Sequence, residues 1–181
     1  MEKNGVNVDQ LIGTIEAVKG DPEVAKFQFR SKTKWVEGGH CKTEFRNFYG
    51  AKTEDSTRTE TIVVEGDEPG ILLGKNRGAN AVEAILHALA SCLTVGFVYN
   101  AAASGIAIES LEFELEGDID LHAFLGLSEQ KRPGYDNIRV KYKVKADAPQ
   151  EKLDELFEYV KKTSPVLDML ENPVKVSWEA A

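Results

Sequence analysis

Cysteine and histidine, the residues most often used for metal binding and redox chemistry, are scarce in this chain of 181 residues. The two cysteines, Cys41 and Cys92, and the three histidines lack the spacing of a metal-binding motif. We therefore expect no metal and no other cofactor. Two widely separated cysteines with no secretory signal before them also favour a reducing, cytoplasmic location.

Positive charge is also in short supply, because 22 Lys and Arg residues face 30 Asp and Glu residues and leave a net charge of -8. Such a chain repels phosphate backbones, so we expect no nucleic-acid partner. Repeats, linkers and low-complexity tracts are absent from the sequence, and its length suits one domain. We predict a single domain over residues 1–181, with residues 1–24 as an N-terminal helical extension.

Hydrophobic periodicity predicts a mixture of helices and antiparallel strands, which is the α+β class. Apolar residues three and four positions apart predict a helix from Val8 to Val18, ended by Gly20-Asp21-Pro22. Alternating residues predict strands over 27–35 and 41–47, joined by Gly38-Gly39, and a further strand over 61–65.

The most distinctive segment runs from Ala81 to Ala103, with only Glu83 and His87 as ionisable groups and no proline. Its length would suit a membrane span, but these polar residues and the sparse basic flanks weaken that interpretation. We predict no membrane association, and instead a central helix buried on all sides, in part by a second subunit. Asn80 and Glu83 form a capping-box pattern at its start, and Ser104-Gly105 predicts its end.

The rest of the chain predicts two half-buried strands, two helices and a last strand. Glutamates alternate along 111–116 and basic residues along 138–145, so antiparallel pairing would set opposite charges side by side. Asp147 is the predicted cap of the next helix, and Ser164-Pro165 starts another. Alternation of Val174, Val176 and Trp178 predicts the final strand.

Taken alone, the reactive side chains have ordinary structural explanations. Cys92 suits a small core residue of the central helix, because free cysteine is among the most buried residue types. Cys41 suits an incidental half-buried thiol, Glu83 a capping residue, and His40 a turn residue after the glycine pair. The alternative, in which Cys92 or Glu83 takes part in chemistry, stays open at this point.

Three segments together are similar to the OsmC/Ohr family, the osmotically inducible protein C and organic hydroperoxide resistance proteins. They are 78–83 (GANAVE), 88–93 (ALASCL) and the pair 164–166 and 172–174 (SPV and NPV). The resemblance spans roughly residues 25 to 178. It implies the OsmC-like fold, with antiparallel sheets and a long buried central helix in an intertwined homodimer, and so supplies a reason for the apolar segment.

The resemblance also implies roles for single residues. Cys92 takes the position of the family's peroxidatic thiol, which attacks a peroxide and becomes a sulfenic acid. Ser164 stands where the family has a second, resolving cysteine, so the two-cysteine cycle is absent. His40 falls at the family's activating arginine, and Glu83 lies one residue beyond its glutamate. Cys41 is a substitute resolving thiol if the two sulfurs can approach.

Two hypotheses from different classes follow. In the first, the protein is an OsmC-like thiol peroxidase of oxidative-stress defence, in which Cys92 reduces organic hydroperoxides or related small electrophiles and an external thiol is the reductant. In the second, it is a non-catalytic dimer that binds a small apolar molecule in the family pocket. The observation that supports this second hypothesis is the loss of the second cysteine together with the displacement of both activating groups.

Overall fold

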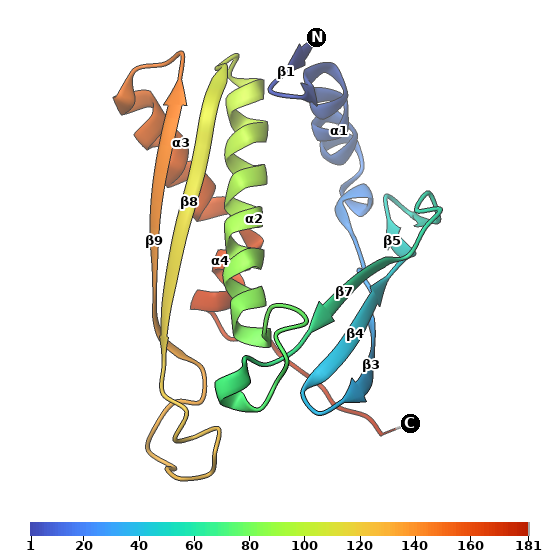
Figure 1. Cartoon of the computed structure of the whole chain (residues 1–181). Coiled ribbons are helices and arrows are strands. Elements are labelled where there is room, and N and C mark those ends of the chain that lie inside the picture. The colour runs from blue at the N-terminus through green and yellow to red at the C-terminus, as the bar shows by residue number, and fades with distance from the viewer. Residues whose placement is uncertain (181) are drawn as a thin grey trace. The chain divides into compact units, whose positions relative to one another are not determined.

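Residues 1–180, which the computed structural model describes, form two compact units (Figure 1). The first contains Met1–Val8 and the chain from Leu86 onward, and the second contains Asp9–Ile85. Elements of the first are β1 (Glu2–Lys3), β2 (Val6–Asn7), most of α2 (Ala81–Ala103), β8 (Ile108–Ile119), β9 (Tyr135–Ala146), α3 (Gln150–Thr163) and α4 (Pro165–Glu171). Those of the second are α1 (Val8–Gly20), η1 (Pro22–Ala25), β3 (Lys32–Glu37), β4 (His40–Phe45), β5 (Phe48–Gly50), β6 (Thr53–Asp55), β7 (Ile62–Gly66) and η2 (Gly70–Leu72).

The core of the first unit lies where α2 and α3 pack against one face of the β8–β9 hairpin. Its buried residues are Leu89, Leu93, Phe97 and Ala101 from α2, Ile106 after it, and Leu153, Phe157 and Val160 from α3. The α2 members follow one another at intervals of four, which keeps them on one face of the helix. Phe97 is fully buried, and its ring stacks on that of Phe157 with centroids 4.4 Å apart.

Both ends of α2 form as the sequence predicts. At the start, Asn80 Oδ1 accepts the Glu83 N–H at 2.8 Å while Glu83 Oε2 accepts the Asn80 N–H at 2.9 Å, which is a complete capping box. At the end, Gly105 adopts φ 74°, and the Ile106 N–H donates to the Ala101 carbonyl at 2.9 Å. A left-handed residue at this position is favourable only for glycine, so Gly105 sets the end of the helix.

The predicted pairing of glutamates with basic residues is confirmed in the β8–β9 hairpin. Glu112 pairs with Lys143, Glu114 with Lys141 and Glu116 with Arg139. Their side chains are solvent-exposed, and the ion pairs that form among them are Glu116–Arg139 and the diagonal Glu114–Lys143. Each contributes at most about 1 kcal/mol, so the pairing mainly favours this register.

In the second unit, β3, β4 and β7 form an antiparallel sheet with β4 in the middle. This confirms the predicted hairpin across Gly38-Gly39 and the predicted strand near 61–65, although β3 begins five residues later than expected. The ring of Phe27 instead stacks with those of Phe29 and Phe48, and the chain at Gln28 bridges to Tyr49. The short hairpin β5–β6 was not predicted.

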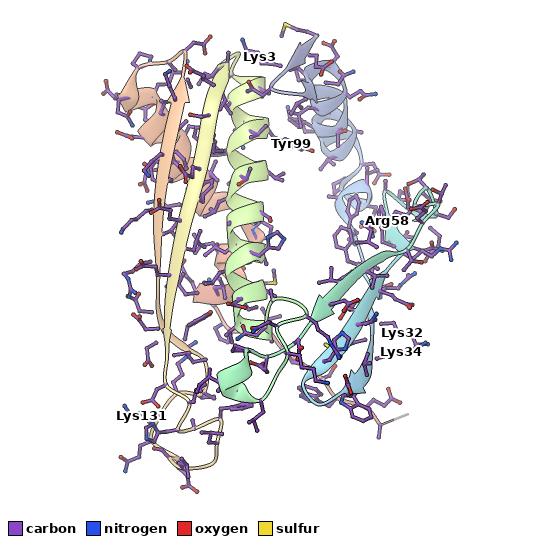
Figure 2. The ribbon with its side chains drawn as sticks, viewed as in Figure 1. Lys3, Lys32, Lys34, Arg58, Tyr99 and Lys131 are labelled. Atoms are coloured by element: carbon purple, nitrogen blue, oxygen red, sulfur yellow. The ribbon has the colours of Figure 1, made fainter. Side chains whose placement is uncertain are left out.

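Within this single chain α2 is covered on one face only, since Val95 and Tyr99 are about half exposed, and Figure 2 shows Tyr99 on the side of α2 that faces away from β8. The predicted burial of that side by a second subunit stays a prediction. Two sequence predictions are wrong. Asp147 does not cap α3, whose N-cap is Pro149; its carboxylate accepts the Ala107 N–H instead. Residues 173–180 form no strand, because no strand among residues 1–180 pairs with them.

Candidate functional site

Cys92 lies about three turns into α2, on the edge of its buried face. The side chain is partly buried, and its Sγ lies 3.2 Å from the Ser164 hydroxyl oxygen. This contact joins two segments of the first unit that are 72 residues apart in the sequence. The structure therefore brings together two of the residues singled out in the sequence, Cys92 and Ser164.

Ser164 occupies the junction between α3 and α4 and is 5% exposed. Its backbone is extended, and its hydroxyl oxygen accepts the Leu167 N–H at 3.2 Å, so Ser164 is the N-cap of α4. Pro165 at the first helical position fixes the backbone for the new helix. This local sequence pattern holds the Ser164 side chain in place against Cys92.

A pocket of about 430 Å³ adjoins the Cys92 sulfur, and apart from the three hydroxyl groups its walls are mainly apolar. Its lining residues are Ser91, Cys92, Val95, Gly96, Val160, Thr163, Ser164 and Pro165. Gly96 has a packing role here, since a Cβ at this position would lie 3.0 Å from Val160 Cγ1. The pocket is large enough for a small organic molecule and presents the sulfur to it.

His87 does not contact Cys92. Its Nε2 lies 3.4 Å from the Ser91 hydroxyl one helical turn later. Of the residues that the structure describes, only Ser164 forms a hydrogen bond with the Cys92 sulfur.

His40 belongs to a separate polar cluster in the second unit. The ring is 5% exposed, with Nε2 2.8 Å from Glu65 Oε2 and Nδ1 2.9 Å from an Arg77 guanidinium nitrogen. A guanidinium only donates hydrogen bonds, so Nδ1 accepts and Nε2–H donates to Glu65. The two hydrogen bonds fix the ring, and the cations around it are Arg77, Lys75 and Lys42.

The carboxylates of this cluster are held in their ionised form. Hydrogen bonds from Lys75 and then Arg77 lower the pKa of Glu37, and hydrogen bonds from Lys42 and then His40 lower the pKa of Glu65. A cavity of about 150 Å³ beside His40 is bordered by Glu37, Lys75 and Arg77 among others. Glu37 pairs with Lys75 at 3.0 Å and with Arg77 at 2.6 Å. With Glu65 and Asp67 counted against Lys42, the cluster is closely balanced in charge.

Asp67 ties the loop after β7 to the same cluster. It is 3% exposed and accepts the backbone N–H groups of Glu68, Lys75 and Arg77. Burial alone would raise the pKa of Asp67, but these three hydrogen bonds outweigh it and the net pKa is lowered. The buried carboxylate therefore fixes the backbone that carries Lys75 and Arg77.

The structure gives the other predicted site residues local partners. Glu83 is engaged in the capping box with Asn80. Cys41 is a free thiol on β4, paired with Trp35 and Gly66 across the sheet. Like His40, both residues belong to the second unit, whereas Cys92 and Ser164 belong to the first. The catalytic roles of His40 and Glu83 and the resolving role of Cys41 therefore stay predictions.

Sequence reasoning named the Cys92 and Ser164 pair but missed the surroundings of the site. The pocket residues Gly96, Val160 and Thr163 come from α2 and α3. Of these, the sequence could have indicated only Gly96, which follows Cys92 by four residues and so lies on the same side of the helix. The partners of His40 lie 25 and 37 residues away. No local pattern marks them.

Residues 1–180 contain no group of three His, Cys, Asp or Glu side chains placed to hold a metal ion. By length and apolar composition alone, α2 could cross a membrane.

The fold and the site together define an α+β protein with a thiol at the wall of a mainly apolar pocket. Comparison with known proteins identifies the family. A family model described as OsmC-like protein matches residues 74–179, which is more than half of the chain. The protein belongs to this family. None of the curated proteins matches the sequence.

Solved structures share the fold at low sequence identity. An OsmC-like protein from Mycoplasma pneumoniae is 15% identical, with a TM-score of 0.60 over 81% of this chain and 89% of that one. An organic hydroperoxide resistance protein OsmC from Legionella pneumophila is 13% identical, with a TM-score of 0.54 over 79% and 88%. An OsmC-like protein of unknown function from Vibrio cholerae is 13% identical, with a TM-score of 0.54 over 80% and 94%. These matches confirm the predicted OsmC-like α+β fold.

Proposed function

We propose that this protein is a thiol peroxidase that reduces organic hydroperoxides, or related small electrophiles, in oxidative-stress defence, with Cys92 as the attacking thiol. The observation that supports the proposal most directly is the Cys92 sulfur at the wall of an apolar pocket, hydrogen-bonded to a buried hydroxyl. Membership of the OsmC-like family and the fold shared with a hydroperoxide resistance protein from Legionella pneumophila point the same way.

In the proposed reaction the Cys92 thiolate attacks one oxygen of the peroxide bond. The S–O bond forms as the O–O bond breaks, and the leaving alkoxide takes a proton to become an alcohol. Cys92 is thereby oxidised to a sulfenic acid and the peroxide is reduced. The mainly apolar pocket wall would hold the organic part of the substrate while the sulfur faces its peroxide group.

Return to the thiol needs a reductant from outside the chain, because Ser164 cannot form a disulfide. An external thiol would displace water from the sulfenic acid to give a mixed disulfide, and a second thiol would release Cys92 and leave as the oxidised disulfide. Cys41 would take the first of these steps only if it can reach Cys92. In this proposal Glu83 and His40 assist the attack, as the family resemblance implies, in addition to their structural contacts.

The proposal is tested by stopped-flow mixing with cumene hydroperoxide, with the loss of each thiol assigned by peptide mass spectrometry. We expect Cys92 to react faster than free cysteine, Cys92→Ser to lose the fast phase, and Cys41→Ser to keep it. A Cys92 rate no faster than that of free cysteine would count against the enzymatic function. If Cys41→Ser keeps oxidised Cys92 in the sulfenic form longer, Cys41 is the resolving thiol.

The second candidate is a non-catalytic binding protein for a small apolar molecule. It is favoured by the mainly apolar pocket together with the engagement of Glu83 in a helix cap and of His40 in a buried hydrogen-bond network. Native mass spectrometry of freshly purified protein separates the two candidates. A stoichiometric ligand with an unreactive Cys92 supports binding, and the absence of both ligand and reactivity leaves a structural homologue without either function.

We further propose a cytoplasmic homodimer. The half-exposed Val95 and Tyr99 on the long apolar helix α2 support the dimer, because a contiguous apolar face of this kind is commonly covered by another protein surface. Sedimentation should give a dimer at micromolar concentration, and a stable folded monomer would contradict it.

A further inference from the structure

The Ser164 hydroxyl has one hydrogen to donate, and its environment restricts where that hydrogen can go. The side chain is almost completely buried, so water is largely excluded from it. One lone pair of the oxygen is used to accept the Leu167 N–H. The other hydrogen-bond partner of the hydroxyl is the Cys92 sulfur at 3.2 Å, so the O–H can point at that sulfur.

Such a contact favours one protonation state of the cysteine. A thiol can donate to the hydroxyl or accept from it weakly, whereas a thiolate can only accept. A hydrogen bond to an ionised acceptor is roughly twice as strong as one between neutral groups. The same Ser164 hydroxyl therefore stabilises the thiolate more than the thiol.

We propose that the Ser164 hydroxyl is the hydrogen-bond donor that stabilises the Cys92 thiolate. Ser164 is then a functional residue of the site and not only the place of an absent second cysteine. The inference rests on the proposed function in one respect, since it matters for peroxide reduction only if Cys92 is the nucleophile. The contact itself can be tested without any peroxide.

The expected magnitude follows from the difference between the two kinds of hydrogen bond. Loss of the donor should decrease the thiolate fraction of Cys92, at a fixed pH where the thiol predominates, by about tenfold, which corresponds to about 1.4 kcal/mol. The pH profile of alkylation should accordingly move by about one unit to higher pH.

Three substitutions separate donation from helix capping. Ser164→Ala removes both the donor and the cap, Ser164→Thr keeps both, and Ser164→Gly removes the donor while glycine remains acceptable at an N-cap and adds no charge beside the sulfur. Thr94→Val is the matched control, because Thr94 lies on the same helix as Cys92 but outside the lining of the pocket, and it donates its hydroxyl to the Ala90 carbonyl at 2.8 Å.

The measurement is the rate of Cys92 alkylation by iodoacetamide from about pH 5 to 10, assigned by peptide mass spectrometry, on variants whose fold is checked by thermal unfolding. We expect Ser164→Ala and Ser164→Gly to move the profile to higher pH and Ser164→Thr and Thr94→Val to keep that of the original protein. An unchanged profile in both Ser164→Ala and Ser164→Gly would overturn the inference. A shifted profile in a protein that does not react with cumene hydroperoxide would support the inference and refute the proposed peroxidase.

Discussion

A cysteine placed at Ser164 should form a disulfide with Cys92. The two side-chain atoms already lie 3.2 Å apart, and a sulfur at this position reaches further than an oxygen because its bond to Cβ is longer. The substitution would restore a pair of thiols at the two positions that the family resemblance identifies. It therefore tests whether the geometry for a two-cysteine cycle has survived in this chain.

The stabilisation can be worked out from the separation of the two residues. The new bond would close a loop over 72 residues, for which the chain-entropy relation gives about 4 kcal/mol at 25 °C. Cysteine is a poorer N-cap than serine, and the weakened start of α4 costs about 1 kcal/mol. The oxidised variant should then gain about 4 kcal/mol over its reduced form and about 3 kcal/mol over the original protein.

The assay is urea unfolding of Ser164→Cys with and without reductant, together with a count of free thiols. After mild oxidation we expect the midpoint to rise and the thiol of Cys41 alone to remain titratable. Thr163→Cys is the control, because the Thr163 hydroxyl points to a backbone carbonyl rather than to Cys92. Ser164→Cys that keeps all its thiols under oxidation, or cross-links no better than Thr163→Cys, would refute the geometry described for this site.

Three further predictions concern packing, acid stability and substrate access. Phe97→Ala should decrease the free energy of unfolding by about 3 to 5 kcal/mol in urea, because the fully buried ring stacks on Phe157 and its loss leaves a cavity. The lowered pKa of Asp67 stabilises the fold at pH values above 3.8, the ordinary pKa of the carboxyl group, and this stabilisation is lost as the pH falls below that value. Asp67→Asn should therefore lower the melting temperature at pH 7 and make it decline less steeply in acid. A variant whose melting temperature declines in acid as that of the original protein does would contradict this. Gly96→Val adds atoms against Val160 and should slow the reaction with cumene hydroperoxide more than that with hydrogen peroxide, whereas equal slowing would show that the pocket does not receive the organic group.

The elements that the sequence predicts correctly are those fixed by neighbouring residues. The bounds of α2 follow from the Asn80 capping box and from Gly105, both of which act within one helical turn. The register of β8–β9 follows from alternation, which a slip of one residue would reverse. The hairpin β5–β6 escaped prediction because Ala51 and Lys52, which take positive φ in its turn, are not typical residues for that conformation.

The features that the sequence does not predict depend on distant partners. Asp147 has the composition of a helix cap, but its nearest donor is the Ala107 N–H across the sheet. The alternating apolar residues at 173–180 can form a strand only where another strand pairs with their backbone. Likewise, the Ser164 hydroxyl meets Cys92 only because α3 packs beside α2, and Glu65 and Arg77 meet His40 only after the chain has folded.

The central claim is that Cys92 reduces an organic hydroperoxide and becomes a sulfenic acid. It is tested most directly by adding cumene hydroperoxide to the reduced protein without any external thiol, trapping sulfenic acid with dimedone, and measuring both the modified residue and the cumyl alcohol released. The account predicts a dimedone adduct on Cys92, about one equivalent of alcohol per chain, and no adduct once an external thiol is present. An unmodified Cys92 with no more alcohol than free cysteine produces would contradict it.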